Sequence, residues 1–213
     1  SKKDVLRAHT EDHYHHIKSR DHLYDLAILA AGGAIDTAEL AYEEKTGAFG
    51  LIRPPGHHAS EDSAWGFCFF NNIAVSILRL RAEGKIGTAF ILDFDLHTGD
   101  GNINILQGKE DIDVKILNPT ASTEEQYLEI VKNTIEDLED IDILVASAGF
   151  DQGLGDWGDL LSPEAYEKMG TWMKEKSKNL CEGRRYALLE GGYSFDRVAV
   201  NCAAFCKGFR DEE

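Results

Sequence analysis

The sequence predicts an α/β fold in which helices cover both faces of a mostly parallel sheet. Five short segments are almost continuous in apolar residues, which is typical of strands that are buried on both faces. Stretches of helical composition separate these segments. Strands that alternate with helices indicate right-handed crossover connections and therefore a three-layer arrangement.

Each predicted element has a place along the chain. The predicted strands cover residues 48–53, 88–93, 112–117, 141–147 and 185–189. The predicted helices between and after them cover residues 23–44, 72–83, 123–138, 163–179 and 195–209. Ser162 suits the N-cap of the fourth of these helices, because Pro163 follows it at the first helical position.

The chain of 213 residues has an ordinary globular composition, with 43% hydrophobic and 28% charged residues. It contains no linker, repeat or low-complexity tract, so we expect a single catalytic domain over residues 1–213. No apolar run approaches the roughly 18 residues that cross a bilayer, and no signal peptide opens the chain, which predicts no membrane association. Because the chain begins at Ser1, we expect a trimmed or processed product.

The net charge of −16 limits the partners that the protein can bind. An acidic surface repels the phosphate backbone, so we expect no direct nucleic-acid binding. The charge favours cationic partners, or it simply keeps the protein in solution. The four cysteines form no CxxC pair, which argues against a cysteine-based zinc site and predicts free thiols in a reducing compartment, the cytoplasm.

Ionisable side chains, set among glycines, follow four of the five predicted strands. In open α/β sheets, ligands bind beyond the carboxyl ends of the strands. We therefore expect one edge of the sheet to gather His57 and His58 after the first strand, Asp93, Asp95, His97 and Asp100 at the second, Asp151 after the fourth, and Tyr193 after the fifth.

Asp95, His97 and Asp151 form a candidate site for a divalent metal ion. Asp95 and His97 are two residues apart, so in an extended segment they would point the same way. A third ligand from another strand leaves a position for water and substrate. Imidazole and carboxylate ligands without thiolate suit zinc, with iron(II), cobalt or manganese as alternatives. A capping aspartate beside a packed histidine is the alternative interpretation of Asp95 and His97.

His57 and His58 are candidates for general acid–base chemistry. A buried neutral imidazole needs a partner for its N–H group, and Asp93 and Asp100 are the natural acceptors. Each His–Asp pair would fix a tautomer and set a pKa, as proton transfer requires. The alternative is a structural histidine pair that bonds to backbone carbonyls.

Tyr193 follows Gly191 and Gly192, and these glycines allow backbone and substrate to approach closely. The Tyr193 hydroxyl would stabilise an oxyanion opposite the metal, or else the residue anchors a turn. Gly66 and Phe67 belong to an aromatic segment that is either core or the lining of a narrow channel for the substrate.

A second histidine group lies near the start of the chain. His9, His13 and His16 have helical spacing, which makes another metal site conceivable. We expect instead that His13 and His16 belong to a solvated helix face.

Five ordered motifs resemble the zinc-dependent histone deacetylase family, which includes acetylpolyamine amidohydrolases and acetoin-utilisation proteins. They are RPPGHHA at 53–59, GFCFFNN at 66–72, DFDLHTGDGN at 93–102, AGFD at 148–151 and LEGGY at 189–193. The resemblance runs from about His9 to about Phe209. It implies an arginase/deacetylase-like three-layer fold, here shortened, which agrees with the fold that the strand pattern predicts.

The resemblance also implies a role for each candidate residue. Asp95, His97 and Asp151 would hold Zn²⁺, and K⁺ would bind nearby through Asp93 and the segment from Asp95 to His97. His57 would pair with Asp93, and His58 with Asp100. Tyr193 would donate to the acetyl oxygen, Gly66 would accept from the substrate amide, and Phe67 would form a wall of the acyl-lysine tunnel, with Gly191 and Gly192 beside the substrate.

The chain departs from the family pattern in several places. Thr98 stands where many relatives have a second histidine, and the chain is shorter than most of its relatives. The strand expected before His9 is absent, and the loop at residues 19–22 and the stretch between Leu117 and Asp151 are short. Phe67 therefore has no obvious opposite wall. We expect a shallower, more open cleft that admits bulky or protein-borne acyl-lysines, or, alternatively, a fragment that has lost activity.

The expected function is metal-assisted hydrolysis, with a protonated imidazole, His58, donating to the leaving amine. The substrate would be an acylated lysine peptide or protein, or an acetylpolyamine. A ureohydrolase of the same fold is an alternative that requires two metal ions. A non-catalytic acyl-lysine binding module is another, although it has no need of His57, His58 and Tyr193.

Overall fold

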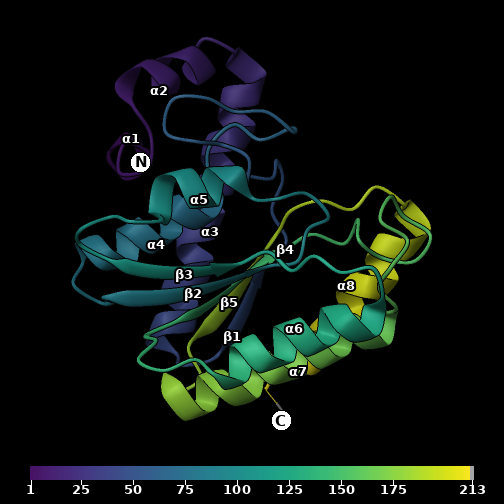
Figure 1. Ribbon diagram of the computed structural model, residues 1–213. Helices are drawn as coiled ribbons and strands as arrows, with labels where there is room; N and C mark the ends of the chain where they lie inside the picture. The colour runs from purple at the N-terminus through teal and green to yellow at the C-terminus, as the bar shows by residue number, and fades with distance from the viewer. Residues whose placement is uncertain (212–213) are drawn as a thin grey trace.

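A five-stranded parallel sheet forms the centre of the computed structural model, which describes residues 1–211 (Figure 1). The strand order is β1-β5-β4-β2-β3, and every neighbouring pair is parallel. The α/β prediction is therefore confirmed. The strands are β1 (Gly47–Gly50), β2 (Thr88–Asp93), β3 (Asp113–Leu117), β4 (Leu144–Ala148) and β5 (Arg185–Leu189).

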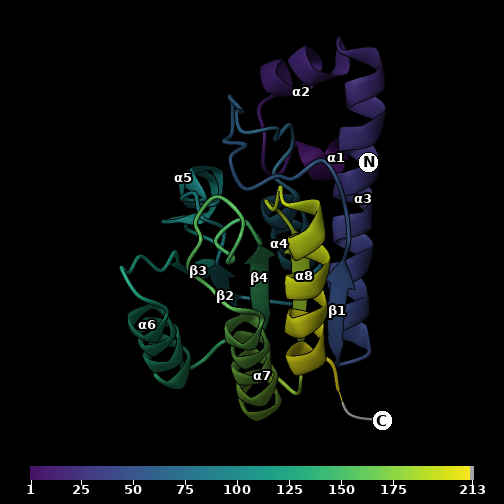
Figure 2. The ribbon, with the colours of Figure 1, turned by 90° about the vertical axis from the view of Figure 1, so that its right-hand side faces the viewer.

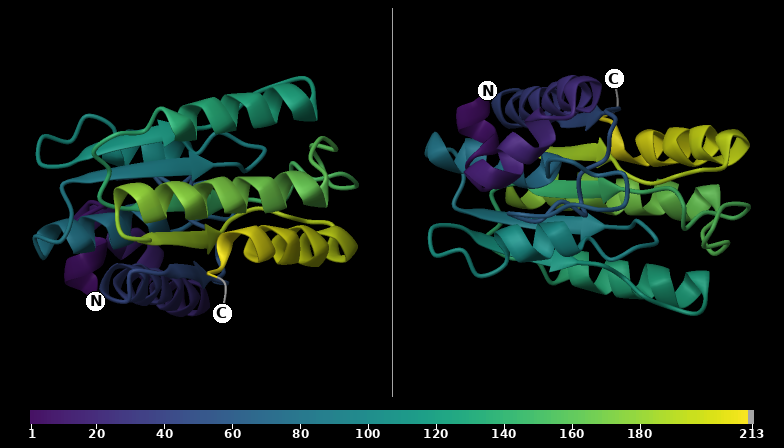
Figure 3. Two further views of the ribbon diagram at one scale, coloured as in Figure 1. Left: turned by 90° about the horizontal axis from the view of Figure 1, so that it is seen from below. Right: turned by 90° about the horizontal axis from the view of Figure 1, so that it is seen from above.

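Helices cover both faces of this sheet (Figures 2 and 3). The first face packs against α3 (Asp21–Glu43), α4 (Asn72–Ala82) and α5 (Asp100–Leu106), while α1 (Lys2–Val5) and α2 (Glu11–Lys18) pack on α4 and α3. The second face packs against α6 (Glu124–Glu136), α7 (Pro163–Leu180) and α8 (Phe195–Phe209). No helix in the described residues combines the length and the apolarity that a membrane crossing requires.

The central strand β2 shows why the predicted strands are almost continuous in apolar residues. Successive side chains of a strand point to opposite faces of the sheet. Ala89 and Ile91 accordingly belong to the core on the α3–α4 side, whereas Phe90 and Leu92 belong to the core under α6, α7 and α8. Both faces are buried, so polar residues appear only where the strand ends.

Two predicted strand boundaries are wrong. The first strand ends at Gly50 rather than at residue 53, because the chain leaves the sheet edge at Leu51, which is exposed. The fourth strand begins at Leu144 rather than at residue 141. Asp142 instead turns its carboxylate to the backbone N–H groups of Gly87 and Thr88, at 2.6 and 2.9 Å.

The helix predictions agree with the structure within a few residues, but α1, α2 and α5 are not among the five predicted helices. The predicted cap of α7 is present, since the Ser162 hydroxyl accepts from the Ala165 N–H at 3.2 Å. Helix α5 matters most for the site, because it begins at Asp100 directly beyond the end of β2. It thereby brings Asp100 and Asn102 back over the sheet edge.

Candidate active site

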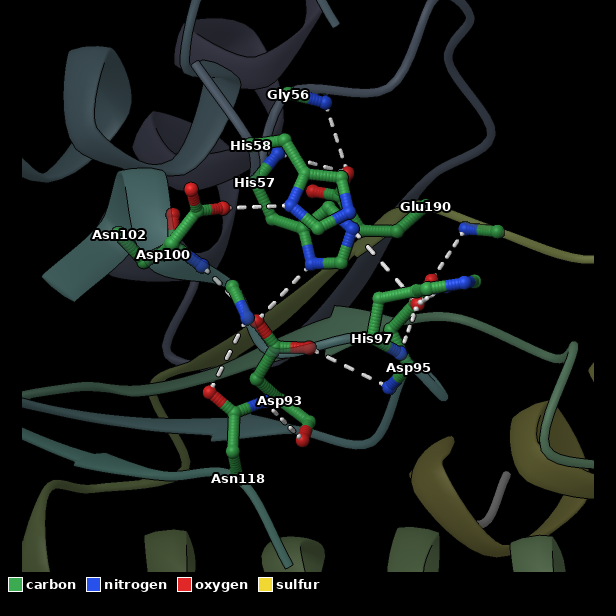
Figure 4. Close-up of polar contacts among 12 residues, drawn as sticks. Gly56, His57, His58, Asp93, Asp95, His97, Asp100, Asn102, Asn118 and Glu190 are labelled. Atoms are coloured by element: carbon green, nitrogen blue, oxygen red, sulfur yellow. Dashed lines mark hydrogen bonds and ion pairs between the residues drawn. The ribbon is translucent and has the colours of Figure 1, made fainter. Parts of the chain in front are cut away.

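The three central strands deliver the candidate residues to one edge of the sheet (Figure 4). Strands β5, β4 and β2 are neighbours, so the segments that follow their carboxyl ends lie side by side. These segments carry Glu190 to Tyr193, Gly149 to Asp151, and Phe94 to His97. The His57–His58 segment, which follows β1, lies over the same edge.

Asp95, His97 and Asp151 converge as a metal site requires. One ligand atom from each lies within 4.8 Å of the others. The His97 Nδ1 atom is 3.2 Å from Oδ1 of Asp95 and 3.1 Å from Oδ2 of Asp151. Oδ2 of Asp151 is buried and accepts no hydrogen bond within the described residues. A divalent cation satisfies a buried carboxylate oxygen that has no hydrogen-bond donor, so these residues fit the expected metal.

Backbone N–H groups orient the two carboxylates. Gly191 donates to Oδ2 of Asp95 at 2.8 Å, and Leu96 donates to Oδ1 of Asp151 at 2.9 Å. A side chain at Gly191 would not fit, because its Cβ would lie 2.5 Å from Asp95 Oδ2 and 2.8 Å from Asp151 Oδ2. Position 191 therefore requires glycine, because two candidate metal ligands pack against it. Contact between Gly191 and the substrate stays a prediction.

The expectation that Asp95 and His97 lie on an extended segment is wrong. The chain bends after β2, and the His97 N–H donates back to Oδ1 of Asp95 at 2.9 Å. The bend, rather than the alternation of a strand, brings the two side chains together.

The site concentrates negative charge in a buried place. Burial and the charge of Asp95 raise the pKa of Asp151 above its usual range. Two buried carboxylates in contact disfavour ionisation of both unless a positive charge lies between them. This electrostatic arrangement supplies a second reason to expect a bound cation.

His57 pairs with Asp93, the last residue of β2. Its Nδ1 atom lies 3.2 Å from Oδ2 of Asp93, which also accepts from Asn102 Nδ2 at 3.2 Å. Burial lowers the pKa of His57, but the charges of Asp93, Glu190 and Asp95 outweigh this effect and raise it to about 10. The imidazole is therefore positively charged at neutral pH.

His58 pairs with Asp100, and its pKa is shifted in the opposite direction from that of His57. Its Nδ1 atom lies 2.7 Å from Oδ1 of Asp100. Burial and the positive charge of His57 lower the pKa of His58. The ring stacks on Trp65 at 3.8 Å between centroids, and Trp65 Nε1 donates to Oδ2 of Asp100 at 2.9 Å. Trp65 thus touches both members of the pair.

Glu190 is a site residue that the sequence analysis did not single out, although it lies within the LEGGY motif. It is fully buried, and its Oε2 accepts from the backbone N–H groups of Gly56 and His57 at 2.8 and 3.1 Å. Burial raises the pKa of Glu190 to about 7. Its carboxylate fixes the turn that presents the two histidines.

Tyr193 has aromatic neighbours on two segments. Its ring centroid is 6.3 Å from that of Phe67 and 4.0 Å from that of Trp157, on which it stacks. Trp157 thus adds an aromatic side chain from the loop after β4 beside Tyr193, and the absence of a wall opposite Phe67 stays a prediction. Phe67 and Trp157 are 66% and 61% exposed, which places both at the mouth of the site.

The early histidines do not form a metal group. His13 is buried and bonds through Nε2 to the Phe69 carbonyl at 2.8 Å, so its assignment to a solvated face is wrong. His9 is also buried, with Nδ1 at the Ser60 carbonyl and Nε2 accepting from the Asn71 N–H. Only His16 of the three is exposed. Among the described residues, the metal-compatible group is the one formed by Asp95, His97 and Asp151.

The expected potassium position involves an oxygen that is already hydrogen-bonded. Asn118 Nδ2 donates to the carbonyl of Asp93 at 3.0 Å. Asn118 also accepts from the Gly99 N–H at 3.3 Å, which links β3 to the loop after β2. Potassium binding through Asp93, Asp95 and His97 stays a prediction.

Comparison with known proteins assigns the chain to a family. The sequence profile of the histone deacetylase domain matches residues 1–117. A probable deacetylase from Archaeoglobus fulgidus is 30% identical and aligns with 92% of this chain. The chain belongs to the histone deacetylase family. A second archaeal probable deacetylase, from Methanothermobacter thermautotrophicus, is also 30% identical, over 89% of the chain.

A solved structure agrees with this assignment at the level of the fold. The HDA15 HD domain superposes with a TM-score of 0.86 at 23% identity, covering 98% of this chain and 73% of that one. The alignments cover 68% and 66% of the two archaeal relatives, so this histone deacetylase homologue spans about two thirds of their length. The family resemblance found in the sequence motifs is confirmed.

Proposed function

We propose that the chain is a zinc-dependent amidohydrolase that removes acetyl or other acyl groups from lysine side chains or polyamines. The supporting observation is the convergence of the Asp95, His97 and Asp151 ligand atoms at the sheet edge that also holds two His–Asp pairs. Amide hydrolysis needs electrophilic activation, a base for water and an acid for the amine. This edge offers candidates for all three tasks.

His58 is suited to carry the proton. Its Nδ1 atom is engaged by Asp100, so Nε2 is the nitrogen left for the reaction. Because the pKa of His58 is lowered, the ring is neutral at neutral pH and can accept a proton from water as the water oxygen attacks the acyl carbon. The same proton then passes to the amine nitrogen as the C–N bond breaks, which leaves a carboxylic acid and an amine. The acid then gives its proton to the amine, so the products at neutral pH are a carboxylate and an ammonium ion.

Tyr193 is suited to stabilise the oxyanion that forms during this attack. Burial and the charges of Asp95 and Asp151 raise the pKa of Tyr193 to about 12, so its hydroxyl keeps its proton and can donate it in a hydrogen bond. His57, positively charged beside Asp93, adds a fixed charge near the same centre.

Asp95, His97 and Asp151 would hold the metal ion. A divalent cation in this place supplies Lewis acidity and lowers the pKa of water. A ligand set of one imidazole and two carboxylates suits Zn²⁺, and Fe²⁺ or Co²⁺ are the alternatives. The exposed Phe67, together with Gly66, would line the approach of the acyl-lysine stem.

The test is acetate release by protein that has been stripped with a chelator and reloaded with zinc. The substrates are a panel of acetyl-lysine peptides, longer acyl-lysine peptides and acetylpolyamines. Asp151→Ala is the inactive control, and Asp159→Asn on the same loop is the matched control, because Asp159 is exposed. The proposal predicts release by the wild type and the Asp159→Asn variant, and none by Asp151→Ala.

The same panel defines the substrate class and the alternatives. Turnover of acyl-lysine peptides supports the open cleft, whereas turnover confined to small acetylated amines contradicts it. Tight binding of acyl-lysine without acetate release would instead identify a binding module. Two zinc ions per chain, together with urea release from guanidino substrates, would identify a ureohydrolase.

A further inference from the structure

The loop between β4 and α7 carries the metal-ligand candidate Asp151 near its start and is held by hydrogen bonds of its own backbone. The Gly158 N–H donates to the Asp151 carbonyl at 2.8 Å, and the Asp156 N–H donates to the Gly153 carbonyl at 3.0 Å. These bonds fix residues 156 and 157 relative to Asp151. In Figures 1 and 2 this green loop lies beside the N-terminal end of α8.

Asp156 contacts the backbone of Tyr193. Its Oδ2 atom accepts from the N–H groups of Tyr193 at 2.8 Å and Ser194 at 2.7 Å. The Ser194 side chain provides no cap for α8, and Asp156 instead binds the N–H groups of the N-cap residue and of the residue before it. A carboxylate at a helix N-terminus is also favoured by the helix dipole.

Trp157, the next residue, contacts the ring of Tyr193. The two rings stack with centroids 4.0 Å apart and planes 16° apart. The Trp157 ring also meets His97 edge-on, at 6.0 Å between centroids. One side chain therefore spans the distance between a candidate metal ligand and the candidate oxyanion donor.

Apart from the Phe67 ring, 6.3 Å away between centroids, little else orients Tyr193. It follows Gly191 and Gly192, and Gly192 has a φ of 130°, a conformation that glycine adopts without strain. The next aromatic residue, Phe195, is 93% exposed and packs little against the domain. In the described part of the chain the Tyr193 hydroxyl has no hydrogen-bond partner, so the contacts with Asp156 and Trp157 are the main restraints on its position.

We propose that Asp156 and Trp157 are positioning residues, which hold the backbone and the ring of Tyr193 respectively in the orientation that catalysis uses. The inference rests on the proposed role of Tyr193 as oxyanion donor. Neither residue touches the reacting atoms. Both act through Tyr193, so their effect on turnover should disappear when the Tyr193 hydroxyl is absent.

A double-mutant cycle tests this dependence. Asp156→Ala and Trp157→Ala should each lower kcat by about tenfold or more, with a smaller effect on KM, since misplacement of a catalytic group costs up to roughly 100-fold. Trp157→Phe should restore much of the loss, because it can still stack. In the Tyr193→Phe background, each alanine substitution should change kcat by less than about twofold, as expected for groups that act as one unit. Asp159→Asn is the control on the same loop.

Near-ultraviolet circular dichroism of the chelated protein provides a measurement that is independent of activity. Trp157→Leu should remove the aromatic band of the stacked pair, and Asp156→Ala should reduce the same band while far-ultraviolet spectra stay unchanged. An Asp156→Ala spectrum identical to that of the wild type overturns the proposal, as do alanine effects on kcat that are additive with Tyr193→Phe. If the wild type shows no turnover, the proposed function is refuted. In that case the spectra still test whether Asp156 and Trp157 orient Tyr193.

Discussion

The indole ring of Trp65 stacks on the imidazole of His58, with 3.8 Å between the ring centroids. The same indole donates to the Asp100 carboxylate that pairs with His58. Trp65 therefore acts as a cover over one His–Asp pair, and burial is the leading cause of the lowered pKa of His58. The acid limb of the pH profile of kcat/KM should therefore report the pKa of His58.

Trp65→Ala should shift the acid limb of kcat/KM to higher pH. Opening His58 to water weakens the burial that lowers its pKa, so the pKa rises and the neutral base is lost at a higher pH as the solution is acidified. Trp65→Phe should give a smaller shift because a ring remains over His58. Trp172→Phe, on α7, is the control, and an unchanged acid limb in Trp65→Ala would refute the role of this cover.

Tyr193→Phe should lower kcat by roughly 100- to 1000-fold, or about 2.7–4 kcal/mol, which is the range measured when one oxyanion donor is removed. The ring of phenylalanine can still stack on Trp157, so the fold should be unaffected. Steady-state kinetics with the preferred acyl-lysine peptide measure this loss. Turnover equal to that of the wild type would show that Tyr193 is not the donor.

Glu190→Gln should change how stability depends on pH. The pKa of Glu190 is raised to about 7 in the folded protein, so its contribution to stability is fully present below its ordinary pKa and lost as the pH rises through 7. The glutamine variant carries no such titration. Urea unfolding should therefore show the variant gaining stability relative to the wild type between pH 5 and pH 8.

The size of the Glu190 effect should be at most a few kcal/mol, because one pKa unit corresponds to about 1.4 kcal/mol. The amide oxygen of glutamine can still accept from Gly56 or His57, so the variant should fold. A difference in unfolding free energy that is the same at both pH values would mean that Glu190 does not titrate in this range.

Gly191→Ala should weaken zinc binding about 10- to 100-fold, the range found when groups that orient metal ligands are changed. A methyl group at this position would lie within 2.5 Å of Asp95 Oδ2 and displace one ligand from the other. Gly32→Ala on α3 is the matched control, since nothing lies within 4 Å of the added carbon. Competition with a zinc chelator measures both affinities, and equal affinities would contradict the proposed ligand packing.

Much of the fold follows from the sequence because the strands are buried on both faces. Phe90 and Ile91 face different cores, and a segment of that kind is recognisable without any alignment. Helix α5 could not be predicted in the same way, since Asp100, Gly101 and Asn102 have low helix propensity. Its start depends on the bend after β2 and on the pairing of Asp100 with His58.

The candidate ligands were predictable because parallel strands end at a common edge. This rule and the ligand chemistry of the side chains were enough to predict Asp95, His97 and Asp151 as one group. Glu190 was not predictable from such reasoning, because its partner Gly56 lies 134 residues earlier in the chain. Trp157 was also missed, because its stack with Tyr193 is a contact between two loops that the sequence does not reveal.

The central claim is that Asp95, His97 and Asp151 hold one divalent metal ion on which acyl hydrolysis depends. The most direct measurement is a zinc titration of chelated protein in which bound zinc and acetate release are followed together. The account predicts that release rises in proportion to bound zinc and reaches a plateau at one zinc per chain, with neither binding nor release in Asp151→Ala. Release that is independent of zinc, or that requires two zinc ions per chain, would contradict it.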